Sequence, residues 1–200
     1  MRNENQFEQI KIELKKHLKP HRFNHTLGVV KMASKLAKQY GIDVQQARLA
    51  ALLHDCAKNF SNQEMLQVAK DAKIALDPIM LLEPQLLHGP VGAVVAKKTY
   101  HVHDPEVLSA IACHTTGKCD MSLLDKIIYL SDFIEPGRDY PGVERLRHDC
   151  FEKDINSACK EAFDNTISYV ISIGGLLHPK TIEARNYIII EDKYQFEKDC

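Results

Sequence analysis

The chain has 200 residues, of which 44% are apolar, a size and composition typical of a globular protein with a hydrophobic core. With 26 lysines and arginines against 27 aspartates and glutamates, the net charge of −1 excludes any global attraction to nucleic acid or to an anionic membrane. No apolar run is long enough to span a bilayer, and the polar N-terminus does not resemble a signal peptide. We therefore expect a cytoplasmic protein without nucleic-acid or membrane partners, whose six scattered cysteines are free thiols.

Apolar residues recur at helical spacing from the N-terminus onward. They predict a first helix that ends before Pro20 and a second that is closed by Gly41. Asp43 is suited to cap a third helix, which the run of alanine, leucine and arginine extends over residues 45–57.

The rest of the chain carries further helix start and stop signals, and no strand-turn pattern repeats in it. A helix is favoured over a strand for residues 187–190. We predict an all-α fold, a single helical bundle in one domain over residues 1–200, with its core at about residues 17–190. The remaining segments are, in order, a capping-box helix from Ser61 to Ala72, a loop or short helix from Asp77 to Glu83, and helices from Leu86, from Asp104 to His114, from Leu123 to Asp132, from Glu152 to Ile173, and after Pro179.

Six polar residues stand in or at the end of apolar segments, where an unpartnered charge is costly. For any one of them, a hydrogen-bonded core or cap residue is the simpler interpretation. As a set they would satisfy one another around a cation. The six are His25, His54, Asp55, His88, His114 and Asp132, whereas His17, His21, His101, His103 and His148 lie among polar residues and are expected to be solvated.

The pair His54–Asp55 is central to this interpretation. In isolation such a pair is usually a surface pair or a helix end. On a continuous helix, however, Lys58 would lie four residues after His54, on the same side as both potential ligands.

The order His, His-Asp, His, His, Asp resembles that of the HD-domain metal-dependent phosphohydrolases. Longer motifs around His88, His114 and Asp132 closely resemble one branch, the bacterial symmetrical diadenosine-tetraphosphate hydrolases; Ser131 is a small departure where alanine is expected. The motifs are Leu-Leu-His88-Gly-Pro-Val-Gly-Ala, Ala-Ile-x-x-His114-Thr-Thr-Gly, Asp125-Lys-Ile-Ile-Tyr-Leu-Ser-Asp132-x-Ile-Glu-Pro-x-Arg138 and His178-Pro-x-Thr-x-x-Ala-Arg185-Asn186.

This resemblance implies an HD fold, an iron site and the cleavage of diadenosine tetraphosphate into two ADP by a metal-activated water. His88 and His114 would be either phosphate contacts or ligands to a second ion, to which Asp55 could bridge. The mixed nitrogen and oxygen donors also suit manganese, zinc or cobalt, with one or two ions bound. By the same resemblance, the primary metal ligands are His25, His54, Asp55 and Asp132.

A tetraphosphate chain needs fixed cations and donors. Lys58 and Arg138 are the favoured cations, Thr115 can add donors, and Arg22 is a weaker candidate. We therefore expect Asp55, Lys58, His88 and His114 to act in catalysis, and His25, Lys58, His88, His114, Thr115, Asp132 and Arg138 to bind the nucleotide or its metal.

Several alternatives stay open. Gly174–Gly175 and His178–Pro179 form either a loop that faces the nucleoside or an ordinary helix stop and start. Another HD phosphohydrolase, acting on a nucleoside monophosphate or a guanosine alarmone, would use the same residues. A non-catalytic nucleotide-binding HD module is disfavoured because all six candidate positions are filled. A homodimer is possible.

Overall fold

A computed structural model describes residues 2–199, and side chains from residue 4 to residue 194. This part of the chain contains helices and turns and no strand, which confirms the all-α prediction. The helices are α1 (Arg2–His17), α2 (Pro20–Gln39), α3 (Val44–Leu53), α4 (Asn62–Asp71), α5 (Pro78–Leu82), the 3₁₀ turn η1 (Pro84–Leu87), α6 (His88–Lys98), α7 (Pro105–Cys113), α8 (Leu123–Ile134), α9 (Val143–Glu152), α10 (Ile155–Ser172) and α11 (Pro179–Asp199).

The predicted caps form as the sequence indicates. Asp43 accepts hydrogen bonds from the amides of Gln45 and Gln46 at the start of α3, and Ser61 with Glu64 completes a capping box on α4. Gly41 takes the left-handed conformation (φ 70°) after α2.

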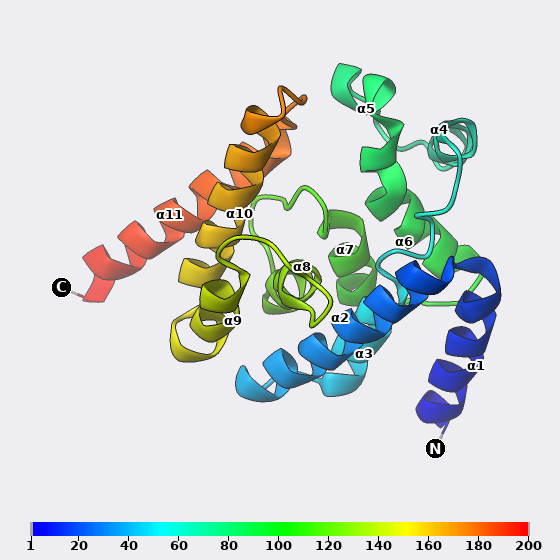
Figure 1. Ribbon diagram of the computed structural model, residues 1–200, viewed down its shortest axis with the longest axis horizontal. Coiled ribbons are helices and arrows are strands. Elements are labelled where there is room, and N and C mark those ends of the chain that lie inside the picture. Colours follow the sequence, from blue (N-terminus) through cyan, green and yellow to red (C-terminus); the bar gives the residue numbers. More distant parts are fainter. Residues whose placement is uncertain (1, 200) are drawn as a thin grey trace.

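Four helices, α2, α3, α7 and α8, pack against one another at the centre of the molecule (Figure 1). Their facing sides supply most of the buried apolar residues, and α1 covers α2 and α3. The antiparallel pair α10 and α11 lies on one side of this centre, with α10 against α8. On the other side, α6 packs on α7, and α4 and α5 lie beyond α6.

The third helix is shorter than predicted. It ends at Leu53, so that His54, Asp55 and Lys58 lie in a series of turns. In these turns, backbone amides donate hydrogen bonds to the carbonyls of residues three positions earlier. The carbonyl of Ala51, which a continuing α-helix would offer to the amide of Asp55, accepts from the imidazole of His54 at 2.7 Å. The expectation that Lys58 shares a helix face with His54 was therefore wrong.

The segment before residue 155 also differs from the prediction. The sequence predicted one helix that begins at Glu152. In the structure, α9 ends at Glu152 and a separate helix, α10, begins at Ile155, because the side chain of Asp154 accepts a hydrogen bond from the amide of Ser157. Helix α9 was missed because it is polar and begins after a left-handed glycine, Gly142 (φ 92°), which reads as a turn.

Two smaller expectations concern the cysteines and the membrane. Cys56, Cys113, Cys119, Cys150 and Cys159 are free thiols, and Cys200 lies outside the described residues. Between residues 2 and 199, no helix has the combined length and apolar character that crossing a bilayer requires.

Candidate active site

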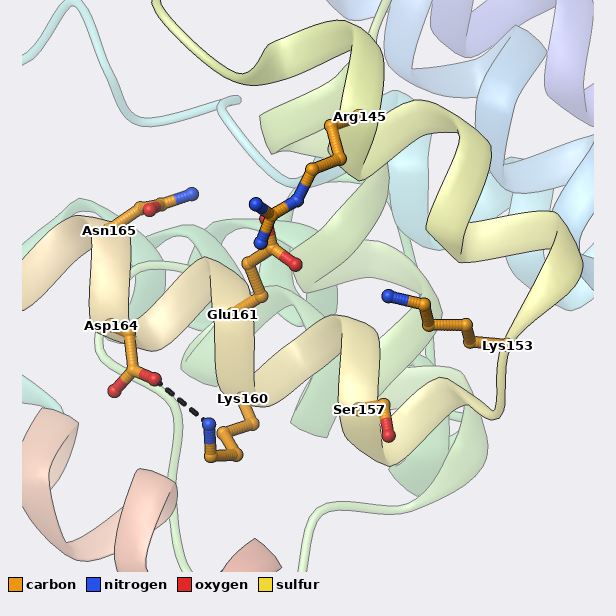
Figure 2. Close-up of a pocket in the computed structure, with 7 residues that line it drawn as sticks. All are labelled: Arg145, Lys153, Ser157, Lys160, Glu161, Asp164 and Asn165. Atoms are coloured by element: carbon orange, nitrogen blue, oxygen red, sulfur yellow. Dashed lines mark hydrogen bonds and ion pairs between the residues drawn. The ribbon is translucent and has the colours of Figure 1, made fainter.

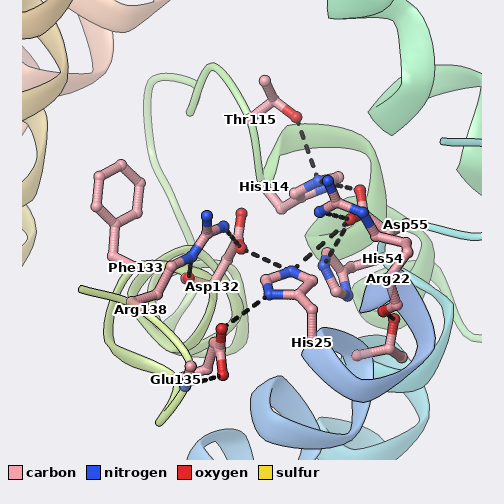
Figure 3. Close-up of polar contacts among 12 residues, drawn as sticks. Arg22, His25, His54, Asp55, His114, Thr115, Asp132, Phe133, Glu135 and Arg138 are labelled. Atoms are coloured by element: carbon pink, nitrogen blue, oxygen red, sulfur yellow. Dashed lines mark hydrogen bonds and ion pairs between the residues drawn. The ribbon is translucent and has the colours of Figure 1, made fainter. Parts of the chain in front are cut away.

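The structure brings all six candidate residues into one cluster, and Figure 3 shows five of them, His25, His54, Asp55, His114 and Asp132. Their ligand atoms form three overlapping groups, and within each group the atoms lie within 4.8 Å of one another. The groups are His25, His54 and Asp55; His54, His114 and Asp132; and Asp55, His88 and His114. The five histidines that were expected to be solvated are exposed and are not members of these groups.

Asp55 lies at the middle of the cluster, and its two oxygens face different histidines. Oδ2 lies 3.4 Å from Nε2 of His54 and 3.8 Å from Nε2 of His25. Oδ1 lies 3.4 Å from Nε2 of His88 and 3.7 Å from Nε2 of His114. One carboxylate therefore lies between two pairs of imidazoles.

Each imidazole is fixed through its Nδ1 atom, so that Nε2 faces the cluster. The Nδ1 of His54 lies 2.7 Å from the carbonyl oxygen of Ala51, and that of His114 lies 2.8 Å from the carbonyl oxygen of Ile111. His88 makes the same kind of contact with Gln85. Since a carbonyl oxygen only accepts, Nδ1 carries the proton and Nε2 presents its lone pair.

These lone pairs provide a test of whether the cluster suits a metal. Within the described part of the chain, Nε2 of His25 and Nε2 of His54 are buried and make no hydrogen bond of good geometry, although Oδ1 of Asp132 lies 3.1 Å from Nε2 of His25. Nε2 of His88 lies 3.0 Å from Nε2 of His114, a distance at which two acceptors repel unless a proton or a cation lies between them. Imidazole nitrogens and carboxylate oxygens together fit a transition-metal ion.

The charges of the cluster also suit a cation. Burial alone would raise the pKa of Asp55, but His54 and His114, as positive charges and hydrogen-bond donors in their protonated forms, hold this pKa well below its usual value. The pKa of Asp132 is also lowered, because His25, His54 and Arg138 lower it by more than burial raises it. Burial, with His114 and Lys58 nearby, lowers the pKa of His88 to about 3, which leaves that imidazole neutral.

Three cationic side chains contact the cluster. Arg22 Nη1 donates to Oδ2 of Asp55 at 2.8 Å, and Arg138 pairs with the carboxylate of Asp132 and donates from Nε to its backbone carbonyl at 2.8 Å. Lys58 Nζ lies 3.2 Å from Nδ1 and 3.3 Å from Nε2 of His88, and burial lowers the pKa of this lysine. Arg22, the weaker candidate in the sequence, thus has the most direct contact with Asp55.

Thr115 lies beside the two facing histidines. Its Oγ1 is 2.9 Å from Nε2 of His88 and 3.2 Å from Nε2 of His114. The hydroxyl has only one proton to donate, so it satisfies one of the two nitrogens at a time.

Comparisons with known proteins agree with this geometry. Residues 22–137 match the HD domain family. The chain belongs to the HD-domain family. Within it, the chain is 41% identical to a symmetrical bis(5'-nucleosyl)-tetraphosphatase of Halalkalibacterium halodurans, covering 90% of this chain and 95% of that protein. It is 37% identical to the protein of that name from Bacillus subtilis, covering 88% and 94%.

A solved structure gives the same result for the fold. The crystal structure of a predicted HD superfamily hydrolase involved in NAD metabolism, from Clostridium acetobutylicum, superposes with a TM-score of 0.90 at 44% identity and covers 92% of this chain and 97% of that chain. The resemblance read from the sequence is confirmed, and the HD domain implies a divalent metal in a cluster of histidines and aspartates.

Four residues of the cluster, Asp55, His88, His114 and Asp132, line a pocket of about 740 Å³, within the range of about 300–1,000 Å³ that is usual for small-molecule sites. Lys58, Arg22 and Arg138 line the same pocket. Its wall also contains aromatic and aliphatic side chains that the sequence did not single out as site residues, namely Leu86, Phe133, Tyr140, Tyr169, Val170, Leu176 and Leu177. One pocket therefore combines charged and apolar side chains.

The segment between α10 and α11 is a helix stop and start, and it also lines the pocket. Gly174 (φ 65°) follows the end of α10 and Pro179 begins α11, as expected for a helix stop and start. Leu176, Leu177 and His178 nevertheless line the pocket. His178 is buried, and its Nε2 pairs with Oδ2 of Asp77, the N-cap of α5, at 2.8 Å.

A second hollow, lined by residues of α9 and α10 and by Lys153 between them, has a different character (Figure 2). Four of its five charged side chains are paired with each other, Arg145 with Glu161 at 2.9 Å and Lys160 with Asp164 at 3.2 Å, and the fifth, Lys153, pairs with Asp149 at 2.6 Å. It contains no histidine and shares only Asn165 with the first pocket. We do not assign it a ligand.

Proposed function

We propose that this protein hydrolyses diadenosine tetraphosphate symmetrically, releasing two ADP, in a metal-dependent reaction at the cluster. The observation that carries the proposal is that six potential metal ligands form one cluster, and that four of them line a single pocket together with three cationic side chains. The names of the two bacterial relatives, each matched over most of its length, support a dinucleoside tetraphosphate as the substrate.

The metal would be held by His25, His54, Asp55 and Asp132. When bound, it would supply a Lewis acid for phosphate oxygens and lower the pKa of a coordinated water. Because Oδ1 of Asp55 faces His88 and His114, we propose these two histidines as ligands of a second ion that shares Asp55 with the first. This choice is supported by their Nδ1–H contacts with backbone carbonyls, which direct lone pairs and not protons at the cluster.

Iron is the proposed ion, with manganese, zinc or cobalt able to replace it, since all of them accept mixed imidazole and carboxylate donors. Elemental analysis of the purified protein identifies the metal and gives the number of ions per chain. Close to two equivalents would support the shared-carboxylate arrangement, whereas close to one would leave His88 and His114 as phosphate contacts.

The cationic side chains would bind the polyphosphate. Arg22, Lys58 and Arg138 line the pocket beside the carboxylates, where they can neutralise charge that moves onto the leaving ADP. The planar guanidinium groups of the two arginines match pairs of phosphate oxygens. The Thr115 hydroxyl would donate a hydrogen bond in the same region.

The apolar side chains of the pocket would take a nucleoside. Phe133, Tyr140 and Tyr169 offer ring faces and edges to a base, which is a sequence-tolerant kind of contact. A substrate with two adenosines joined by four phosphates would place one nucleoside here and its phosphates over the cluster.

The wider organisation of the protein is part of the same proposal. We propose one domain over residues 1–200 with a core at about residues 17–190, a cytoplasmic location, and no nucleic-acid or membrane partner. A homodimer is consistent with the proposal but is not required by it, because the residues of the cluster all come from one chain.

The test is the product pattern. Purified protein loaded with Fe²⁺ or Mn²⁺ is incubated with diadenosine tetraphosphate, and the nucleotides are separated by chromatography. Two ADP per substrate are expected; ATP plus AMP would reject symmetrical cleavage. A panel that includes nucleoside monophosphates and guanosine alarmones separates this activity from that of another HD phosphohydrolase, and no turnover of any nucleotide would favour a binding module.

Asp55→Asn is the matching variant. It should abolish both hydrolysis and metal loading, because it removes the carboxylate charge shared by the two pairs of histidines. Asp71→Asn, a change at an exposed carboxylate on α4, is the control and should leave both unchanged. Full activity in Asp55→Asn would reject the mechanism.

A further inference from the structure

Glu135, which follows α8, is buried against His25. Only 4% of this residue is exposed, and its Oε1 lies 3.1 Å from Nδ1 of His25 (Figure 3). The other three imidazoles of the cluster have their Nδ1 atoms fixed by a backbone carbonyl three residues earlier. His25 differs from them because its Nδ1 contacts a carboxylate from a residue 110 positions away.

The reason for this difference lies in the position of each histidine in its helix. His54 and His114 follow the last residues of α3 and α7, and His88 follows η1, so carbonyls near them are not all needed for helical hydrogen bonds. His25 lies inside α2, where backbone carbonyls accept from amides four residues later. The carbonyl of Arg22, three residues before His25, also accepts from the hydroxyl of Thr26 at 3.0 Å. An acceptor for His25 must therefore come from a side chain.

The carboxyl group of Glu135 fits closely between two glycines. A Cβ atom at Gly28, on the same helix as His25, would lie 2.3 Å from Oε2 of Glu135 and 3.3 Å from its Cβ. A Cβ atom at Gly137 would lie 2.9 Å from Oε1. The amide of Gly137 donates to Oε2 at 2.6 Å, so one carboxylate oxygen is fixed by the backbone and the other is left for His25.

The backbone around Glu135 is also held in place. Its carbonyl oxygen accepts from Nη2 of Arg147 at 2.8 Å and from the amide of Arg138 at 2.9 Å. Arg147 Nε in turn donates to the carbonyl of Ile134 at 2.9 Å. The carboxylate therefore meets His25 from a fixed position.

We propose that Glu135 is a positioning residue that keeps the Nδ1 proton on His25 and directs the lone pair of Nε2 toward the metal site. A carboxylate that accepts from the remote nitrogen of a ligating histidine fixes its tautomer and raises its basicity. Gly28 and Gly137 are the residues that make room for this contact. The inference rests on the proposed metal site, but it concerns His25 itself and does not depend on the identity of the substrate.

The first experiment reads the tautomer directly. Long-range ¹H–¹⁵N correlation spectra of the metal-free protein should show His25 protonated at Nδ1, and Glu135→Gln should shift the population toward the Nε2-protonated form. His54, whose Nδ1 contacts the carbonyl of Ala51, is the internal control and should not change. An unchanged His25 tautomer in a folded Glu135→Gln protein would overturn the proposal.

The second experiment measures metal affinity. Titration with Mn²⁺, followed by electron paramagnetic resonance, should show about 10–100-fold weaker binding in Glu135→Gln, the usual effect of losing such a partner. Glu13→Gln, at a half-exposed carboxylate on α1, should bind as the parent does. Parent-like Mn²⁺ affinity in Glu135→Gln would also overturn the proposal.

A second variant covers the case in which Glu135→Gln does not fold. Gly28→Ala keeps both partners and displaces the carboxylate by adding a methyl group against it, so it should give the same loss of Mn²⁺ affinity. If Gly28→Ala is folded and binds Mn²⁺ normally, Glu135 has no positioning role. Failure of the proposed function would look different from failure of this inference. In that case the parent protein would bind Mn²⁺ and show the expected His25 tautomer, but it would release no ADP.

Discussion

Arg22 and Asp55, 33 residues apart in the chain, are joined by a hydrogen bond of 2.8 Å from Nη1 to Oδ2. The carboxylate is almost fully buried, whereas 24% of the arginine side chain is exposed to the pocket. Arg22 is thus placed to contact both a proposed metal ligand and a bound phosphate.

Replacing Arg22 should therefore impair hydrolysis strongly. We expect Arg22→Ala to lower kcat/KM by about 10²-fold, the scale of removing one preorganised donor from a charged transition state. Arg22→Lys should recover only part of the loss, because an ammonium cannot form the paired hydrogen bonds of a guanidinium. Steady-state kinetics measure the effect, and Arg145→Ala, in the second hollow, is the control with parent-like rates. A loss of less than about threefold would remove Arg22 from the phosphate-binding group.

Lys58 gives a second kinetic prediction. Its ammonium lies beside His88, and burial lowers its pKa, so it is a partly desolvated cation within the pocket. Lys58→Ala should lower the rate of hydrolysis by about 10²-fold. The exposed Lys38 on α2 provides the control Lys38→Ala. Equal rates for the two variants would show that Lys58 does not act on the phosphates.

The pair His178–Asp77 predicts a different kinetic signature. It connects the segment before α11 to the cap of α5 at 2.8 Å. His178 lines the pocket, and neither residue belongs to the groups of potential metal ligands. His178→Ala should weaken substrate binding, raising KM by about fivefold, since one buried hydrogen bond is worth about 1 kcal/mol. The value of kcat should stay within about twofold of the parent. A fall in kcat at constant KM would instead place His178 in the chemical step.

Two left-handed glycines allow a matched test of stability. Gly117 (φ 68°) would place a Cβ atom 2.5 Å from Cζ of Phe163 and 2.8 Å from Cβ of Ala184, whereas Gly41 (φ 70°) has nothing within 4 Å. Gly41→Ala should cost about 1 kcal/mol of unfolding free energy from backbone strain alone. Gly117→Ala should cost about 1–3 kcal/mol more, because α10 and α11 must shift.

Urea denaturation followed by circular dichroism measures both changes. If the two variants lose the same stability, then the contact of Gly117 with Phe163 is not close-packed. Because Gly117 follows His114 and Thr115, the larger loss should be accompanied by reduced hydrolysis, whereas Gly41→Ala should keep parent-like activity.

Local signals in the sequence were sufficient to define most of the helices. Asp43, Ser61 and Asp104 satisfy the first amides of their helices through nearby side-chain contacts, so their effect is visible without any tertiary information. The six clustered residues were also recognisable, because a polar side chain in an apolar helical segment requires a partner wherever the helix finally packs.

Tertiary packing decided what each of these residues touches. The end of α3 at Leu53 depends on the imidazole of His54 turning back to a carbonyl inside the core, and Asp77 meets His178 from 101 residues away. Glu135 could be read from the sequence only as a helix end, since its contact with His25 exists only where α8 approaches the glycine of α2. Hydrogen bonding between near neighbours sets local structure, whereas contacts between distant segments exist only after the helices have packed together.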